Sequence, residues 1–263
     1  YDIASCLVGS EMCIRDRVTA TRGNHGQSMA LAAGKAGVPI VIVVPQGNSA
    51  EKNAAMRALG AELVEHGADF DQARAEAARI ARERGYESVP PFHPDLIRGV
   101  ATYALEFFEA VAGLDTVYVP IGMGSGICGL IRTRDLLGLD TQIVGVVSSA
   151  ADAFARSLEA GQIVTTETAD TFADGMACRI PQPEAFEIIR AGAARIVRVS
   201  DEEIARAMRI YHEDTHNTAE GAGAAGLAAL YQERERQRGR RVGVILSGAN
   251  IDRQQYARVL AEG

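Results

Sequence analysis

Three short segments of the chain combine glycines with polar side chains at spacings that suit ligand binding. The first runs from Gly122 to Gly129, follows an apolar run ending in Val-Tyr-Val-Pro, and opens a helical stretch. Glycines let backbone N–H groups converge on an anion, and a helix N-terminus adds partial positive charge, so a phosphate could be held without lysine or arginine. A turn that merely needs glycine is the alternative interpretation. The segment is neither a dinucleotide fingerprint nor a P-loop, because no acidic residue ends the next strand and no Gly-Lys-Ser/Thr follows.

The other two segments also precede helical stretches. Ser247-Gly248-Ala249-Asn250 ends the last apolar run, where ligands of open α/β sheets bind, with a plain helix cap as the alternative. The turn before the first helical stretch offers backbone N–H groups and polar side chains that suit a carboxylate, with a structural turn as the alternative. Its members are Thr21, Arg22, Gly23, Asn24, His25, Gly26 and Gln27.

Composition excludes several classes of protein. The chain has 263 residues and a formal charge of −7 without a basic stripe, which argues against nucleic-acid or anionic-membrane partners. No apolar run approaches the roughly 20 residues that cross a bilayer. The four cysteines are scattered without metal-ligand spacing. We therefore expect a cytoplasmic protein without a metal site.

The elements that must position these segments alternate between strand and helix patterns. This alternation predicts an α/β fold with parallel sheets and helices on their faces. Ser49 is an expected helix cap, and Ser200 with Glu203 forms an expected capping box. Strands are predicted at 38–44, 62–65, 116–120, 142–147, 195–199 and 242–246; helices are predicted at 28–36, 50–59, 70–84, 97–111, 129–137, 152–160, from 200, at 221–237 and from 252.

The N-terminal segment 1–17 does not share these patterns. Its string SCLVGSEMCIRDR resembles translated sequencing-adapter read-through, so we expect an artefact there. An ordinary poorly ordered terminus is the alternative. The remainder is predicted to form a small α/β domain over 18–94 and a large one over 95–263, the latter lacking its natural N-terminal portion.

Taken together, VTATRGNHGQ, VPIGMGSGICG and LSGANID resemble the fold-type II pyridoxal-phosphate enzymes, which are tryptophan synthase β-like in fold. The similarity is greatest to threonine/serine dehydratases and their serine racemase relatives, and it runs from Val18 to Leu260. Further matching stretches are TFADGMA and AEGAGAAGLAAL. The resemblance implies two parallel-sheet domains, pyridoxal 5′-phosphate as cofactor, an amino-acid substrate and a homo-oligomer.

The resemblance also implies roles for individual residues. Asn24 matches the family's asparagine that contacts the cofactor's 3-hydroxyl. Ser247 matches the residue that pairs with the pyridine nitrogen, and Glu220 matches an acidic residue near the cofactor ring. A serine hydroxyl cannot keep the ring nitrogen protonated, which favours β-elimination over chemistry that needs a long-lived carbanion. The turn from Thr21 to Gln27 matches the substrate-carboxylate loop. The backbone that matches the phosphate site belongs to Gly122, Met123, Gly124, Ser125 and Gly126.

The family's Schiff-base lysine has no counterpart in this chain. Only Lys35 and Lys52 are present, both follow the asparagine turn, and we predict both to be solvated. No catalytic residue is therefore assigned, and the chain as written is expected to be inactive. The activity implied for its parent is deamination of L-threonine or L-serine to a 2-oxo acid and ammonia.

Two departures from the family bear on substrate and metal. Arg22 stands where serine racemases place an acid/base serine, which favours elimination and fits a substrate with a second carboxylate. A 3-hydroxyaspartate or hydroxyectoine-pathway dehydratase is therefore an alternative, and a non-catalytic ligand-binding module is another. The family's divalent-cation carboxylates are replaced by Val147 and Ala153, so no metal is expected there.

Overall fold

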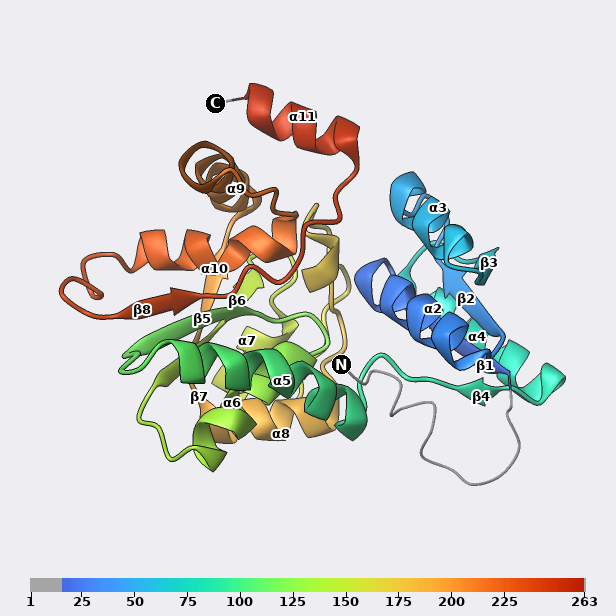
Figure 1. Cartoon of the computed structure of the whole chain (residues 1–263), viewed down its shortest axis with the longest axis horizontal. Helices are drawn as coiled ribbons and strands as arrows, with labels where there is room; N and C mark the ends of the chain where they lie inside the picture. Colours follow the sequence, from blue (N-terminus) through green and yellow to red (C-terminus); the bar gives the residue numbers. More distant parts are fainter. Residues whose placement is uncertain (1–15, 263) are drawn as a thin grey trace. The chain divides into compact units, whose positions relative to one another are not determined.

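Two parallel β-sheets organise the chain, one in each of two compact units (Figure 1). The computed structural model describes residues 16–262. Of these, the first unit holds 16–99 together with 250–252, and the second holds 100–249 and 253–262. The α/β class with two parallel sheets is thus confirmed.

The first unit has a four-stranded sheet in the order β3-β2-β1-β4 with parallel neighbours. Hydrophobic side chains of β2 alternate between its faces, as a strand buried on both sides requires. Ile40, Ile42 and Val44 pack with Met29 and Met56 of the helices α2 and α3. The other face packs on α4. The elements are β1 (Arg17–Ala20), α2 (Asn24–Ala36), β2 (Ile40–Val44), α3 (Ala50–Ala58), β3 (Glu62–Glu65), α4 (Phe70–Arg84) and β4 (Glu87–Ser88).

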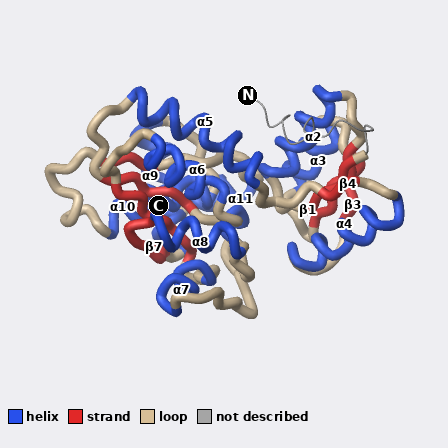
Figure 2. Tube along the Cα trace, turned by 90° about the horizontal axis from the view of Figure 1, so that it is seen from below, coloured by secondary structure: helices blue, strands red, loops and turns tan. Residues whose placement is uncertain are grey.

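The second unit has a parallel sheet in the order β7-β6-β5-β8. Helix α10 covers one face, with α9 packed against it, and α6 covers the other beside α5 and α8 (Figures 1 and 2). Its elements are α5 (Pro94–Ala110), β5 (Thr116–Pro120), α6 (Ser125–Leu136), β6 (Gln142–Ser148), α7 (Ala153–Ala160), the short 3-10 helix η1 (Asp174–Met176), α8 (Pro183–Gly192), β7 (Ala193–Val199), α9 (Asp201–Thr215), α10 (Gly221–Gln232), β8 (Val242–Val244) and α11 (Arg253–Ala261).

Several boundaries differ from those predicted. Helices α2 and α6 begin four residues earlier than expected, because glycine is compatible with a helix's first turn and does not delay its start. Helix α10 ends at Gln232 instead of residue 237, and β8 ends at Val244 instead of Leu246. The expected caps are confirmed: Ser49 accepts the Lys52 N–H at 3.0 Å, and the Ser200 capping box is present.

The division between the units falls after Gly99, whereas the sequence placed it at residue 94, and α5 spans both positions. Arg17 was assigned to the discordant N-terminal segment, but it begins β1, is buried, and pairs with Glu87 at 2.6 Å. In the rest of that segment, the Asp16 carbonyl oxygen accepts the Glu87 N–H at 2.9 Å, and residues 1–15 lie outside the described residues. Within 16–262, no helix is both long and apolar enough to cross a membrane.

Candidate ligand-binding site

The glycine-rich turn of the second unit joins β5 to α6. Gly124, at φ 101°, is the N-cap of α6 and forms no side-chain cap bond. Ser125 and Gly126 therefore occupy the first helical turn, where backbone N–H groups have no acceptor within the helix. Such a turn can receive an anion on N–H groups and the positive end of the helix dipole.

The two outer glycines of this turn meet different surroundings. A Cβ added to Gly122 would lie 2.2 Å from the carbonyl oxygen of Gly175 in η1, so glycine is needed there for close packing. A Cβ on Gly126 would meet nothing closer than 3.9 Å. A side chain at residue 122 would therefore clash with backbone, whereas a Cβ at residue 126 would make only ordinary van der Waals contact.

Glu220 and Ser247 reach the same edge of the sheet as this turn. Strands β5 and β8 are parallel neighbours, so the segments that follow them emerge at one edge. Glu220 is 3% exposed, is the N-cap of α10, and its N–H donates to the carbonyl oxygen of Gly248 at 3.1 Å. Its Oε1 lies 4.0 Å from where a Cβ on Gly175 would be. Gly175, which lies in the stretch TFADGMA, therefore links the glycine turn to Glu220. Ser247 is exposed beside Gly248.

Two titratable side chains border the turn without offering a nucleophile. The Tyr103 hydroxyl donates to the carbonyl oxygen of Gly126 at 3.4 Å, and burial raises the pKa of Tyr103 well above its usual range. Burial raises the pKa of the Cys128 thiol to about 12. Both groups are protonated near neutral pH. Across residues 16–262, no three His, Cys, Asp or Glu side chains gather as a metal ion would require.

In the first unit, the turn between β1 and α2 is organised by Thr21. Its Oγ1 accepts the N–H of Gly23 at 2.9 Å and that of Gly26 at 3.3 Å. A Cβ on Gly26 would come within 2.5 Å of Met56 and of Thr21 itself. Thr21 and Gly26 therefore shape the turn, which presents the first-turn backbone N–H groups of α2. Gln27, in the same turn of helix, is half-buried.

His25 is held as a neutral ring. Thr19 Oγ1 donates to the Val89 carbonyl oxygen at 2.7 Å and lies 3.2 Å from His25 Nε2. With its own proton committed, that hydroxyl accepts from Nε2–H, which leaves Nδ1 as the acceptor of the ring. Burial lowers the pKa of His25 to about 4.

The side chain of Asn24 accepts a hydrogen bond that the sequence did not predict. Asn250 Nδ2 donates to Asn24 Oδ1 at 2.8 Å, although the two residues are 226 positions apart. The segment carrying Asn250 is also fixed by a hydrogen bond from Ser49 to Asp252. Orientation of the Asn24 amide is therefore set by a residue that follows β8.

The cationic side chains near this turn behave differently from one another. Arg22 is half-buried, and its buried Nε has no hydrogen-bond partner within residues 16–262. Lys35 is exposed, as predicted. The same prediction for Lys52 is wrong: it is 5% exposed, because its chain lies across Gly23 at the start of α2. The sequence of the first turn of α3 contains no pattern that predicts the contact of Lys52 with Gly23.

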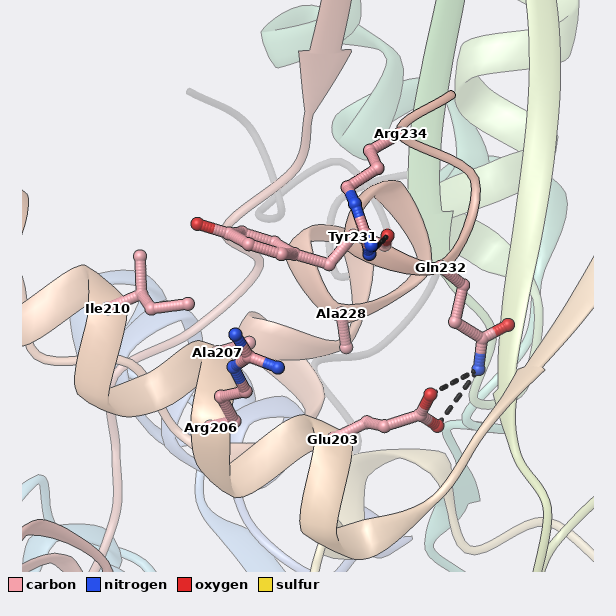
Figure 3. Close-up of a pocket in the computed structure, with 8 residues that line it drawn as sticks. All are labelled: Glu203, Arg206, Ala207, Ile210, Ala228, Tyr231, Gln232 and Arg234. Carbon is pink, nitrogen blue, oxygen red and sulfur yellow. Dashed lines mark hydrogen bonds between the residues drawn. The ribbon is translucent and has the colours of Figure 1, made fainter. Parts of the chain in front are cut away.

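A separate hollow lies between α9 and α10 (Figure 3). Its residues on α10 run from Ala228 onwards, so it lies towards the opposite end of that helix from Glu220. Gln232 Nε2 donates to both carboxylate oxygens of Glu203, at 2.8 and 2.9 Å, and the Arg206 guanidinium lies over the Tyr231 ring. The polar groups that line the hollow bind one another. The hollow is distinct from the candidate site because it lies at the other end of α10.

Comparison with known proteins gives consistent matches. The model of the family described as "Pyridoxal-phosphate dependent enzyme" matches residues 11–248. An L-threonine ammonia-lyase of Thermotoga maritima is 34% identical over 250 residues, which are 95% of this chain and 62% of that protein. The chain thus spans less than two thirds of that relative's length.

Two further matches extend the comparison. An L-threo-3-hydroxyaspartate ammonia-lyase of a Pseudomonas species is 34% identical over 92% of this chain and 76% of its own length. The processed form of threonine deaminase isoform 2 from Solanum lycopersicum has a TM-score of 0.89 at 29% identity, with 98% of this chain and 77% of that one covered. The expected similarity to threonine dehydratases is confirmed.

Proposed function

Because the chain belongs to the family of pyridoxal-phosphate-dependent enzymes, we propose that it derives from a dehydratase that deaminates a small β-hydroxy amino acid, L-threonine or L-serine, to a 2-oxo acid and ammonia. One observation carries the proposal beyond family membership. The glycine turn, Glu220 and the segment of Ser247 meet around Gly175 and Gly248 at one edge of the sheet in the second unit.

The residues present fit the cofactor. A phosphate would fit the first-turn N–H groups of α6, which follow the left-handed Gly124. Met123 and Ser125 replace glycines common in the family, but backbone donors survive these changes. The exposed Ser247 hydroxyl suits a ring nitrogen, and Glu220 supplies a buried carboxylate close by. Bound pyridoxal phosphate would supply the electron sink for removal of the α-proton.

The chain's own residues have three tasks in this proposal. Backbone N–H groups from Gly122 to Gly126 would bind the phosphate, and Ser247 would orient the ring through a neutral hydrogen bond. The family resemblance implies that Asn24, whose amide oxygen accepts from Asn250, would contact the cofactor's 3-hydroxyl. The turn from Thr21 to Gln27 binds the substrate carboxylate, with neutral His25 as part of its wall.

No residue of this chain is assigned to proton abstraction. Lys35 is exposed at the end of α2, and Lys52 lies against the carboxylate turn in the first unit. We therefore propose that the chain as written binds the cofactor without turning over.

The test compares the chain with the gene's full-length product. Titration of the chain with pyridoxal 5′-phosphate should show saturable binding, and Gly124→Val, which strains the left-handed N-cap, should weaken it at least tenfold. The full-length protein should release 2-oxo acid from threonine or serine. Absence of saturable cofactor binding in both proteins would contradict the proposal.

Arg22 favours a second candidate, a dehydratase of 3-hydroxyaspartate. Its buried Nε lacks a partner within residues 16–262, and guanidinium pairs well with a second carboxylate. A relative named L-threo-3-hydroxyaspartate ammonia-lyase covers 92% of this chain. The full-length protein should then prefer 3-hydroxyaspartate, and Arg22→Ser should lose that preference by about tenfold or more while retaining serine turnover. Equal effects on both substrates would exclude this role for Arg22.

A further inference from the structure

We propose that Asp201 is a positioning residue for the cofactor site and acts through the η1 segment, residues 171–176. The inference rests on the proposed function, because the site it concerns is the glycine turn with Glu220 in the second unit. Asp201 is the first residue of α9. Its carboxylate binds the η1 segment, and the η1 segment in turn contacts the site.

The Asp201 carboxylate joins the η1 segment to the end of β6. Thr171 Oγ1 donates to its Oδ1 at 2.6 Å, and the Phe172 N–H donates to its Oδ2 at 3.1 Å. Ser148 Oγ, at the end of β6, donates to Oδ1 at 3.2 Å. Both carboxylate oxygens are thus used, and hydrogen bonds to an ionised acceptor are stronger than those between neutral groups.

The helix that carries Asp201 does not need this carboxylate as its cap. Ser200 is the N-cap of α9, and it exchanges hydrogen bonds with Glu203 in a complete capping box. The positive end of the helix dipole favours Asp201, and it equally favours Glu202 in the same turn. What distinguishes Asp201 is that its oxygens accept hydrogen bonds from the η1 segment.

The η1 segment packs against both the glycine turn and the start of α10. A Cβ on Gly122 would lie 2.2 Å from the Gly175 carbonyl oxygen. A Cβ on Gly221 would lie 2.9 Å from both Cα and Cβ of Ala173. Because these close contacts involve backbone atoms, a movement of the η1 segment would displace the glycine turn or the start of α10, which follows Glu220.

Thr171 extends the hydrogen bonds of Asp201 into η1. Its Oγ1 donates to Asp201 and accepts the Ala173 N–H at 3.1 Å. The Met176 N–H donates to the Ala173 carbonyl oxygen at 2.8 Å, which closes the short helix around Gly175. A continuous chain of hydrogen bonds therefore runs from Asp201 to the part of η1 that contacts the glycine turn.

The test measures cofactor affinity and stability separately in the 263-residue chain. Asp201→Asn keeps the size of the side chain, removes its charge and leaves one acceptor oxygen for three donors. Thr171→Val removes the hydroxyl that donates to Asp201. Glu202→Gln is the matched control, because Glu202 is exposed in the same turn of α9 and loses the same charge. Titration with pyridoxal 5′-phosphate would give each dissociation constant, and urea denaturation would give each stability.

We expect Asp201→Asn and Thr171→Val each to weaken cofactor binding by about tenfold. The double variant should lose about as much as either single variant, because both changes break the same hydrogen bond. Glu202→Gln should bind the cofactor as the parent chain does.

A merely structural role for Asp201 would lower the urea midpoint and leave the dissociation constant of the folded chain unchanged, and this result would overturn the proposal. An equal loss in Glu202→Gln would also overturn it, because the effect would then come from the charge of the helix end. If Asp201→Asn does not fold, Thr171→Val decides by the same two measurements. A parent chain that does not bind the cofactor would contradict the proposed function as well, whereas equal binding by the parent and Asp201→Asn contradicts the role of Asp201 alone.

Discussion

Replacing Gly122 by alanine should destabilise the second unit, whereas the same change at Gly126 should not. The added Cβ at residue 122 would lie 2.2 Å from the Gly175 carbonyl oxygen, a backbone atom that cannot rotate away. Van der Waals contact needs more than 3 Å, so η1 or the turn must move by about 1 Å. Overpacking of this kind costs about 1–3 kcal/mol, and a rigid neighbour favours the upper part of that range.

Gly126→Ala is the matched comparison. Its Cβ would meet Tyr103 Oη and Val119 Cγ2 at 3.9 Å, an ordinary contact, and alanine is a better helix former than glycine by up to about 1 kcal/mol. Urea denaturation of both variants should therefore differ by about 2–4 kcal/mol in the free energy of unfolding. Equal values would refute the packing argument.

Two further predictions concern pH and a half-buried ion pair. The pKa of His25 falls from 6.5 to about 4 on folding, so the unfolded chain binds more protons between these values. The contribution of His25 to stability should be complete above about pH 6.5 and decline by roughly 3 kcal/mol towards pH 4, and His25→Gln should flatten this part of a urea-midpoint pH profile. The Glu233 carboxylate accepts from Arg195 Nε at 2.8 Å and from the Tyr118 hydroxyl. Glu233→Gln should therefore lower the free energy of unfolding by about 2–3 kcal/mol, and Tyr118→Phe should lower it by about 1 kcal/mol. Similar losses for the two variants would show that the charge of the pair contributes nothing.

The sequence by itself determined the fold class, the parallel sheets and most elements. Uninterrupted β-branched runs such as Ile40–Val44 are buried on both faces, and they alternate with capped helices, which is a local signal. Pro183–Gly192 was not predicted because its helical period is short and is preceded by a mixed loop. The two glycine-containing turns were recognised because strand, turn and helix follow each other within a few residues.

Tertiary structure alone decided which distant residues complete those turns. Gly175 lies under Gly122, Gly248 accepts from the Glu220 N–H, and Asn250 donates to Asn24, across separations of 28 to 226 residues. No period or cap encodes such pairings, because they depend on how sheet edges bring loops together. Burial of Lys52 is the clearest case: a lysine in a helix's first turn is usually solvated, and only the packing of α3 beside α2 places its side chain against Gly23.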